Sequence, residues 1–230
     1  MPKAAGKIIV ALDVPTQTEA LNLVGDLSPE IGFFKIGLQL YTTEGPDIVR
    51  AVLATGGRVF LDLKLHDIPN TVAKATESAC KLGVQMLTIH LSGGGEMIQA
   101  AIAAREQKMS ILGVTVLTSA TEKTLSDIGI AEKIDNHVLR LAKLGVTAGI
   151  DGLVASPHEI KTLRAKFGDR IKIVVPGIRP GRAAPGDQKR VMTPREALDA
   201  GADYLVIGRP IIAHSSPRAA LAKILEELNA

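Results

Sequence analysis

The sequence predicts a single α/β domain of the (β/α)8, or TIM, barrel class that spans residues 1–230. Eight short apolar runs alternate with amphipathic, helix-like stretches along the chain. The first five runs begin about 25 residues apart, which is close to the length of one strand-plus-helix unit. No linker or change of composition divides the chain, and its length suits one barrel domain. A doubly wound parallel sheet is the structural alternative.

The eight predicted strands are mostly apolar on both faces. This pattern is typical of parallel strands that lie between a packed barrel interior and an outer layer of helices. The predicted strands are Ile8–Leu12, Phe33–Ile36, Val59–Leu63, Met86–Ile89, Leu112–Leu117, Gly152–Val154, Ile171–Val175 and Tyr204–Ile207.

The stretches between these runs carry signals for helix ends. Thr193–Glu196 has the pattern of a capping box, with Thr as the N-cap and Pro at the first helical position. Ser156–Pro157 and Ser216–Pro217 place the same pair of residue types ahead of two further helices. Three glycines follow helical runs and are expected to adopt left-handed caps: Gly83, Gly145 and Gly201.

Two connections are longer than a simple turn. Residues 118–131 are expected to add a short extra helix. Residues 177–192 are rich in Gly, Pro and charged residues, and a loop of this length in a compact domain is usually functional. We therefore expect residues 177–192 to form a lid over a binding site.

The composition argues against several functional classes. No apolar run approaches the roughly 18 residues that a membrane helix needs, and the N-terminus lacks a secretion signal, so we expect a cytoplasmic protein without a membrane partner. A net charge of +3 with no Trp, four Phe and two Tyr gives little support for nucleic-acid binding and suits a small anionic ligand. The single cysteine, Cys80, is expected to be a buried small residue of a helix.

Charged residues stand at the ends of the first three predicted strands, where barrel enzymes place their active sites. Asp13 follows the first strand, Lys35 lies in the second, and the third carries Asp62 and Lys64. Because Asp62 and Lys64 are two residues apart, their side chains leave the same face of the strand. A buried ion pair would explain these two alone, but Lys35 and the nearby Asp67 favour a preorganised charge network. Asp67 also has a structural interpretation, as a cap of the next helix.

A second group of residues has the features of a phosphate site. Gly208 and Arg209 follow the eighth predicted strand, and barrels of this class commonly bind phosphate in the loops after strands seven and eight. A solvated arginine at a helix start is the alternative. Arg179 and Gln188 in the preceding long loop favour the phosphate site.

The histidines are weaker candidates. His66 is expected to be a packed or hydrogen-bonded structural residue, and His90, at the end of the fourth predicted strand, is a candidate neighbour of the site. The others sit on predicted helices or their flanks and are expected on the surface: His137, His158 and His214. Neither a Ser/His/Asp order, a P-loop, a dinucleotide fingerprint nor a metal-binding cluster is evident.

The chain resembles the orotidine 5′-phosphate decarboxylase family. The resemblance covers nearly the whole chain in order, and the first and third of its motifs are highly specific. The motifs are Phe60–Thr71, Val114–Ser119, Val175–Pro180, Gly186–Gln188 and Val206–Pro210. The resemblance implies a barrel homodimer with shared active sites that converts orotidine monophosphate to UMP and carbon dioxide in pyrimidine synthesis, without a metal or other cofactor.

The resemblance also implies a role for each candidate residue. Lys64 would be the proton donor in an alternating array of Lys35, Asp62, Lys64 and Asp67, with Asp67 supplied by the partner subunit. The array suits the reaction, because loss of carbon dioxide leaves a carbanion at C6 that the π system cannot delocalise and that a fixed ammonium stabilises. The implied substrate contacts are Asp13 and Lys35 for the ribose, Thr118 for the pyrimidine, Gln188, Gly208 and Arg209 for the phosphate, Arg179 for loop closure, and Ile68 and Thr71 near Asp67.

Rival functions share parts of this pattern. Metal-dependent sugar-phosphate decarboxylases and aldolases resemble the chain at strands one, three and eight, but they usually carry a metal-binding Glu where this chain has Lys35. Ribulose-phosphate epimerases are disfavoured because their His-x-Asp metal pair is missing there. A non-catalytic nucleotide-binding barrel would have little use for a lysine between two aspartates.

Overall fold

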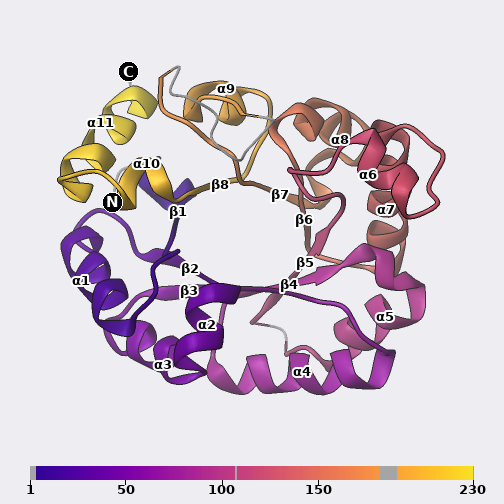
Figure 1. Ribbon diagram of the computed structural model, residues 1–230, viewed down its shortest axis with the longest axis horizontal. Helices are drawn as coiled ribbons and strands as arrows, with labels where there is room; N and C mark the ends of the chain where they lie inside the picture. The colour runs from indigo at the N-terminus through magenta and orange to yellow at the C-terminus, as the bar shows by residue number, and fades with distance from the viewer. Residues whose placement is uncertain (1–3, 107, 182–190, 230) are drawn as a thin grey trace.

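The computed structural model describes residues 4–106, 108–181 and 191–229. Within these residues, eight parallel strands close into a barrel in which each strand pairs with its neighbours in chain order and β8 pairs with β1. Figure 1 shows the helices as a ring around this barrel. The predicted (β/α)8 architecture is confirmed, and the closed strand order excludes the doubly wound sheet.

The strands match the predicted runs to within three residues at either end, and the differences are largest in β3 and β5. β3 continues two residues further than predicted, so Lys64 lies within the strand, and β5 ends three residues earlier, because the chain turns away after residue 114. The strands are β1 Ile8–Ala11, β2 Phe33–Gly37, β3 Arg58–Leu65, β4 Met86–His90, β5 Ser110–Val114, β6 Gly152–Val154, β7 Lys172–Val175 and β8 Tyr204–Ile207.

The helices fill the intervals between the strands, and α6 confirms the extra helix expected in residues 118–131. The α-helices are α1 Gln17–Leu27, α2 Leu38–Glu44, α3 Asp47–Ala54, α4 Pro69–Leu82, α5 Gly94–Ala104, α6 Glu122–Asp127, α7 Ile134–Ala148, α8 Ile160–Phe167, α9 Pro194–Asp199, α10 Arg209–Ile212 and α11 Pro217–Asn229. Short 3-10 helices are η1 Ala5–Lys7, η2 Leu91–Gly93, η3 Pro157–Glu159 and η4 Gly168–Arg170. In the described part of the chain, no helix is long and apolar enough to span a membrane.

The predicted helix ends are confirmed at α4 and α9 but not at α7. Thr193 and Glu196 form the reciprocal capping box at the start of α9. Gly83 ends α4 in the left-handed conformation, with φ of 83°. The prediction for Gly145 is wrong: it lies inside α7, where a Cβ atom would stand 2.6 Å from Ile150 Cδ1, and Gly149 forms the left-handed cap instead. The close packing of neighbouring side chains against α7 therefore favours a residue without a side chain at position 145.

The barrel interior is filled by side chains that point inward from the strands. This inner cluster consists of Ile9, Ala11, Phe33, Phe60, Met86, Leu112, Val174 and Val206. A larger apolar layer lies between the strands and the surrounding helices. Because the interior is packed, a ligand can bind only above it, at an end of the barrel.

Hydrogen bonds from backbone N–H groups to side-chain oxygens fix the N-terminal end of the barrel. Gln85, Asp151 and Asp203 each precede an even-numbered strand. Their side-chain oxygens accept hydrogen bonds of 2.6, 2.8 and 2.7 Å from the backbone N–H of the second residue of the preceding strand. The same device thus recurs three times and locks adjacent strands in register at the end opposite the charged strand ends.

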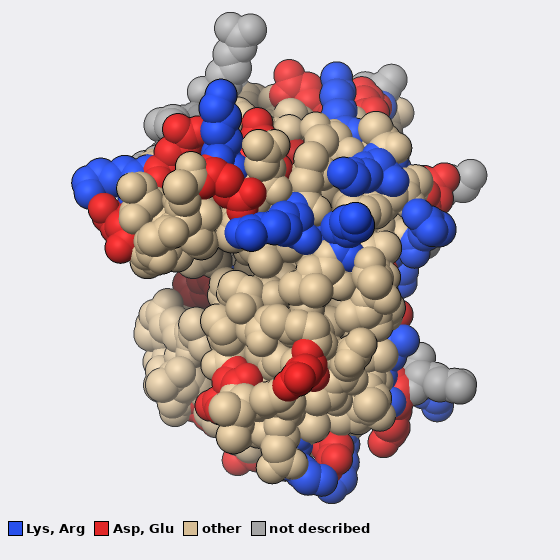
Figure 2. Space-filling view, turned by 90° about the vertical axis from the view of Figure 1, so that its right-hand side faces the viewer, with Lys and Arg blue, Asp and Glu red and all other residues tan. Residues whose placement is uncertain are grey.

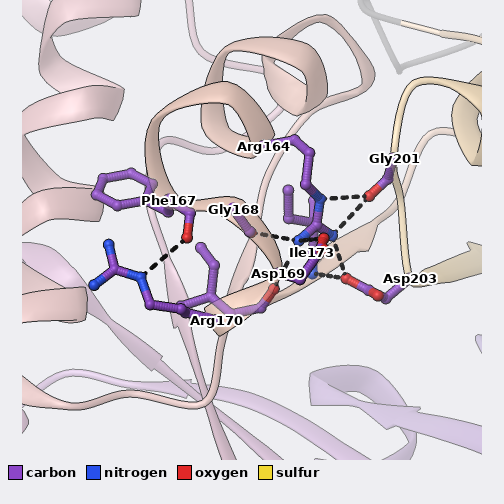
Figure 3. Close-up of polar contacts among 9 residues, drawn as sticks. Arg164, Phe167, Gly168, Asp169, Arg170, Ile173, Gly201 and Asp203 are labelled. Carbon is purple, nitrogen blue, oxygen red and sulfur yellow. Dashed lines mark hydrogen bonds and ion pairs between the residues drawn. The ribbon is translucent and has the colours of Figure 1, made fainter.

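Arg164 of α8 completes one of these connections (Figure 3). Its guanidinium lies 2.6 Å from the Asp203 carboxylate and donates hydrogen bonds to the carbonyl oxygens of Gly201 and Gly168. The Arg164 side chain is largely buried, so these bonds hold α8 against the starts of β7 and β8 at low solvent exposure. The N-terminal end of the barrel therefore serves the stability of the fold.

Candidate active site

A cavity of about 280 Å³ lies at the C-terminal ends of the strands, above the packed interior. It brings together eight of the residues that the sequence analysis singled out, from the ends of β1, β2, β3, β7 and β8 and the segment after β5. The lining residues are Ala11, Asp13, Lys35, Phe60, Asp62, Lys64, Thr118, Val154, Pro176, Gly177, Arg179, Val206, Gly208 and Arg209. A volume of this order fits a mononucleotide-sized ligand.

Four charged side chains in the cavity alternate in sign. The Lys35 ammonium lies 2.9 Å from Asp13 Oδ1 and 3.6 Å from Asp62 Oδ2, and the Lys64 ammonium lies 2.8 Å from Asp62 Oδ1. Lys35 and Asp62 are buried, whereas the Asp13 side chain is half exposed. We call Asp13, Lys35, Asp62 and Lys64 the charge array. Each buried charge faces an opposite one, which offsets the cost of removing it from water.

The end of β2 leaves room for the Lys35 ammonium because residue 37 has no side chain. A Cβ atom at Gly37 would stand 2.8 Å from Lys35 Nζ and 3.4 Å from Asp13 Oδ1. A side chain at position 37 would push the Lys35 ammonium away from its place in the charge array, so the glycine serves this close approach.

Asp62 is ionised despite its burial. Burial alone would raise the pKa of this carboxyl, but Lys35, Lys64 and a hydrogen bond from Thr88 outweigh that effect and hold the pKa below its ordinary value. The negative charge between the two lysines is thus a stable feature of the folded barrel.

The described residues of the predicted phosphate site follow β7 and β8, whereas Asp62 lies in β3. Gly208 and Arg209 stand at the end of β8, and Arg179 is buried in the segment after β7. A backbone hydrogen bond of 3.0 Å from Arg179 N to Met192 O joins the two ends of the long loop. Gln188 and the central part of the expected lid lie outside the described residues.

Asp67, Ile68 and Thr71 lie outside this cavity, exposed at the start of α4. The carboxylate of Asp67 accepts a hydrogen bond of 2.6 Å from the N–H of Ile68, which is itself the N-cap residue, so the interpretation of Asp67 as the helix cap is wrong. Ile68 is 65% exposed, which is unusual for a large apolar side chain beside an active-site strand.

Two predictions about histidines are wrong. His66 is exposed rather than packed, because β3 ends at Leu65 and the chain turns outward. His137 is buried rather than on the surface, with Nδ1 2.6 Å from a Glu132 oxygen and 2.9 Å from an Arg140 nitrogen. The sequence contained a signal for the burial of His137, since it lies one turn before Leu141 on the apolar face of α7.

The other single residues are close to expectation. His90 ends β4 with its ring 5.7 Å from that of His66. Burial lowers the pKa of His90, and His66 and Lys64 lower it further against the opposing effect of Asp62. His158 and His214 are exposed as predicted, and Cys80 is half-buried, with Sγ 3.9 Å from Met109 Sδ.

The apolar floor of the cavity and the buried Thr88 were not predicted from the sequence. Ala11, Phe60 and Val206 each stand two residues before a predicted site residue, so strand alternation places them on the same inward face. That spacing was the signal that would have found them. Thr88, whose hydroxyl donates a hydrogen bond to Asp62, offered no such signal, because its role depends on an irregular pairing of β3 and β4.

A closed parallel barrel with a charge array over a cavity at its strand ends defines a (β/α)8-barrel enzyme. Comparisons with known proteins narrow this class. The model of the orotidine 5′-phosphate decarboxylase / HUMPS family matches residues 6–224. The chain belongs to this family.

Curated relatives and solved structures agree. The chain is 50% identical to orotidine 5′-phosphate decarboxylase of Moorella thermoacetica, over 98% of this chain and 93% of the relative. It is 49% identical to the enzyme of that name from Idiomarina loihiensis, over 98% and 99% of the two chains. A crystal structure of orotidine 5′-phosphate decarboxylase from Lactobacillus acidophilus superposes with a TM-score of 0.85 at 34% identity, over 98% of this chain and all of that one.

The depressed pKa of Asp62 predicts a pH-dependent stability. The stabilisation from ionised Asp62 is complete above the unfolded pKa of about 3.9 and is lost as the pH falls through the lower folded-state pKa. We expect Asp62→Asn to lower the free energy of unfolding by about 3 kcal/mol at pH 7, because the Lys64 ammonium loses its carboxylate partner and Lys35 keeps only Asp13. The difference from wild type should shrink below about pH 4.

Urea denaturation at pH 7 and at about pH 3 measures this difference. Asp47→Asn is the control, because Asp47 is 77% exposed and pairs with Arg50 on the surface of α3. The control should change stability by less than about 1 kcal/mol at either pH. A difference between wild type and Asp62→Asn that is constant with pH would show that Asp62 does not titrate with a lowered pKa.

Proposed function

We propose that this chain decarboxylates orotidine 5′-phosphate to UMP and carbon dioxide, a step of pyrimidine nucleotide synthesis, without a metal or organic cofactor. The observation that carries the proposal is the charge array, in which Lys64 lies beside Asp62 at the edge of a nucleotide-sized cavity. The names of the full-length relatives support the same reaction.

Lys64 supplies the two things that the reaction needs. When the bond between C6 and the carboxylate breaks, its electron pair remains on C6 in the plane of the ring. The Lys64 ammonium stabilises this negative charge as it develops and then gives a proton to C6, leaving a neutral amine that solvent reprotonates. The substrate carboxylate leaves as carbon dioxide, so one proton is consumed for each UMP formed.

Asp62 and Lys35 prepare Lys64 for this role. The contact of 2.8 Å to Asp62 fixes the position of the Lys64 ammonium before substrate binds, so little reorganisation is needed during the reaction. Lys35, 3.6 Å from the same carboxylate, keeps Asp62 ionised. A negative charge at Asp62 also lies where it would repel the substrate carboxylate and favour its departure.

The remaining cavity residues bind the nucleotide. Arg209, Gly208 and Gln188 hold the phosphate, and Arg179 closes the loop over the nucleotide. Asp13 and Lys35 contact the ribose, and Thr118 contacts the pyrimidine. Gly208 and Arg209 follow β8, whereas Lys64 lies in β3, so the binding energy of the phosphate acts at a distance from C6. That energy is available to close the segment after β7 over the substrate and to align C6 with Lys64.

Lys35 also argues against the metal-dependent rivals. Its ammonium stands between the carboxylates of Asp13 and Asp62, at 2.9 and 3.6 Å, and so occupies the place where a cation bridging these two groups would sit. A divalent ion there would be repelled by both lysines of the array. The arrangement of side chains therefore supports decarboxylation without metal.

The active site is completed by a second copy of this chain. Asp67, Ile68 and Thr71 lie exposed outside the cavity, which suits residues that reach into the site of a partner subunit. The start of α5 adjoins them, because Gly93 lines a surface hollow together with Asp67 and Ile68.

The face beside these residues has the composition of an interface. α5 contains one charged residue, Glu96, and Leu144 of the neighbouring α7 is 36% exposed. Figure 2 shows few charged side chains over the lower half of the side of the barrel that carries α5. A face of this kind suits contact with a second copy.

The activity itself is tested with the purified protein after treatment with EDTA. Orotidine 5′-phosphate should be converted to UMP, and the reaction is monitored by the loss of orotate absorbance. Absence of turnover, or turnover only after a metal is restored, would reject the proposed reaction.

Lys64→Ala should lower kcat by about 10⁴-fold or more while the barrel stays folded, because both the stabilising charge and the proton donor are lost.

Lys64→Arg is the matched variant that keeps the positive charge but replaces the ammonium group. It should remain inactive, because a planar and strongly basic guanidinium replaces a compact proton donor. Circular dichroism confirms that both variants are folded. Substantial turnover by either variant would remove Lys64 from the proposed role.

The shared site is tested by mixing two inactive variants, Lys64→Ala and Asp67→Ala, and refolding them together. A mixed dimer has one site with both defects and one site that is intact. Random pairing makes about half of the dimers mixed, so activity should recover to about a quarter of wild type. Each variant refolded alone is the control. A mixture as inactive as its components, with subunit exchange shown by native mass spectrometry, would contradict the shared site.

A further inference from the structure

The pairing of β3 with β4 is irregular beside the charge array. Leu61 pairs with Leu87, but the next paired residues are Leu65 and Ile89. Between these two pairs, β3 advances by four residues and β4 by only two. The extra residues of β3 form a bulge that includes Asp62 and Lys64. Because of the bulge, the β3 segment that carries Asp62 and Lys64 lacks the regular backbone pairing with β4 that would hold it in place.

The backbone of Lys64 is strained in this bulge. Its φ is 51°, and among the described residues it is the only one other than glycine with a positive φ. Residues with a side chain rarely adopt this conformation, and it persists only where the surroundings hold it. Something beside the bulge must therefore hold the Lys64 backbone in place.

Thr88 of β4 stands opposite the bulge and is completely buried. Its hydroxyl oxygen accepts a hydrogen bond of 2.9 Å from the backbone N–H of Lys64 and donates one of 3.0 Å to Asp62 Oδ1. The same Asp62 oxygen accepts a bond of 2.8 Å from Lys64 Nζ. One hydroxyl therefore joins the backbone of Lys64 to the carboxylate that orients its ammonium.

We propose that Thr88 is a positioning residue for decarboxylation, because its hydroxyl replaces the lost strand pairing and holds Lys64 and Asp62 in the geometry that the reaction needs. This inference rests on the proposed function. Thr88 is fully buried and does not line the cavity, so it acts through the charge array and makes no contact with the nucleotide. The described residues that are proposed to bind the nucleotide phosphate follow β7 and β8 instead.

The position of Thr88 predicts which kinetic constant changes. Loss of its hydroxyl should disturb the position of the Lys64 ammonium relative to C6, and small misplacements at a reacting centre have large effects on rate. Phosphate and ribose contacts should be unaffected, so KM and the affinity for UMP should stay near their wild-type values.

Thr88→Val removes the hydroxyl with little change in shape. We expect kcat to fall by about 10- to 100-fold, with KM and the Kd for UMP changed by less than about threefold. Thr88→Ser, which retains the hydroxyl, should restore most of kcat. Thr88→Ala is a second variant without a hydroxyl in case the valine variant folds poorly, and it should lose kcat in the same way.

Thr76→Val is the matched control. Thr76 is equally buried, but its hydroxyl donates to Val72 O within α4. This variant should keep the wild-type kcat even if it is less stable, so a general effect of removing a buried hydroxyl is separated from the effect at the array. Circular dichroism and thermal unfolding of every variant confirm that folded protein is compared.

The outcomes separate the two proposals. If wild type turns over the substrate and the folded Thr88→Val or Thr88→Ala variant does so at the same kcat, the positioning role is overturned and the proposed function stands. A rise in KM at unchanged kcat, or a failure of Thr88→Ser to recover kcat, also overturns the role. If wild type has no activity, the proposed function fails and this inference fails with it.

Discussion

The ammonium of Lys35 between two carboxylates is the interaction on which the rest of the site depends. It lies 2.9 Å from Asp13 and 3.6 Å from Asp62, and Asp62 in turn lies 2.8 Å from Lys64. Without Lys35, the buried Asp62 carboxylate would keep only Lys64 as a countercharge, and its pKa would rise. The carboxylate that orients Lys64 is therefore kept ionised by a residue on a neighbouring strand, and a side chain at position 37 would crowd this residue's ammonium.

The two ends of the barrel differ in structure: the N-terminal end carries regular hydrogen bonds that stabilise the fold, and the C-terminal end carries the charge array. At the N-terminal end, Asp151, Asp203 and Arg164 join strands and helices through short, regular hydrogen bonds. At the C-terminal end, β3 carries a bulge and Lys64 a strained backbone. Strain of this kind is tolerated where the surroundings hold it, and the hydroxyl of Thr88 bonds to the Lys64 backbone at this point. The irregularity is thus confined to the strand that bears the proposed proton donor.

Periodicity and strand-end position were enough to predict the barrel and eight of the residues that line the cavity. These signals are local, because alternation along a strand fixes which side chains share a face. The burial of His137 and the exposure of His66 were predicted wrongly, since each depends on where a helix or strand meets its neighbours. Thr88 was not predicted at all. Its contact with Asp62 arises from a shift in strand register, which residue types alone do not reveal.

The most direct measurement of whether the charge array stabilises a carbanion at C6 is the affinity for a UMP analogue with an ionised oxygen at C6. This anion places negative charge next to the position where the electron pair develops. The wild-type protein should bind it about 10²-fold or more tightly than UMP, as expected for a mimic of the transition state, and Lys64→Ala should lose most of that preference. Equal affinities of the wild-type protein for the anionic analogue and for UMP would contradict the account.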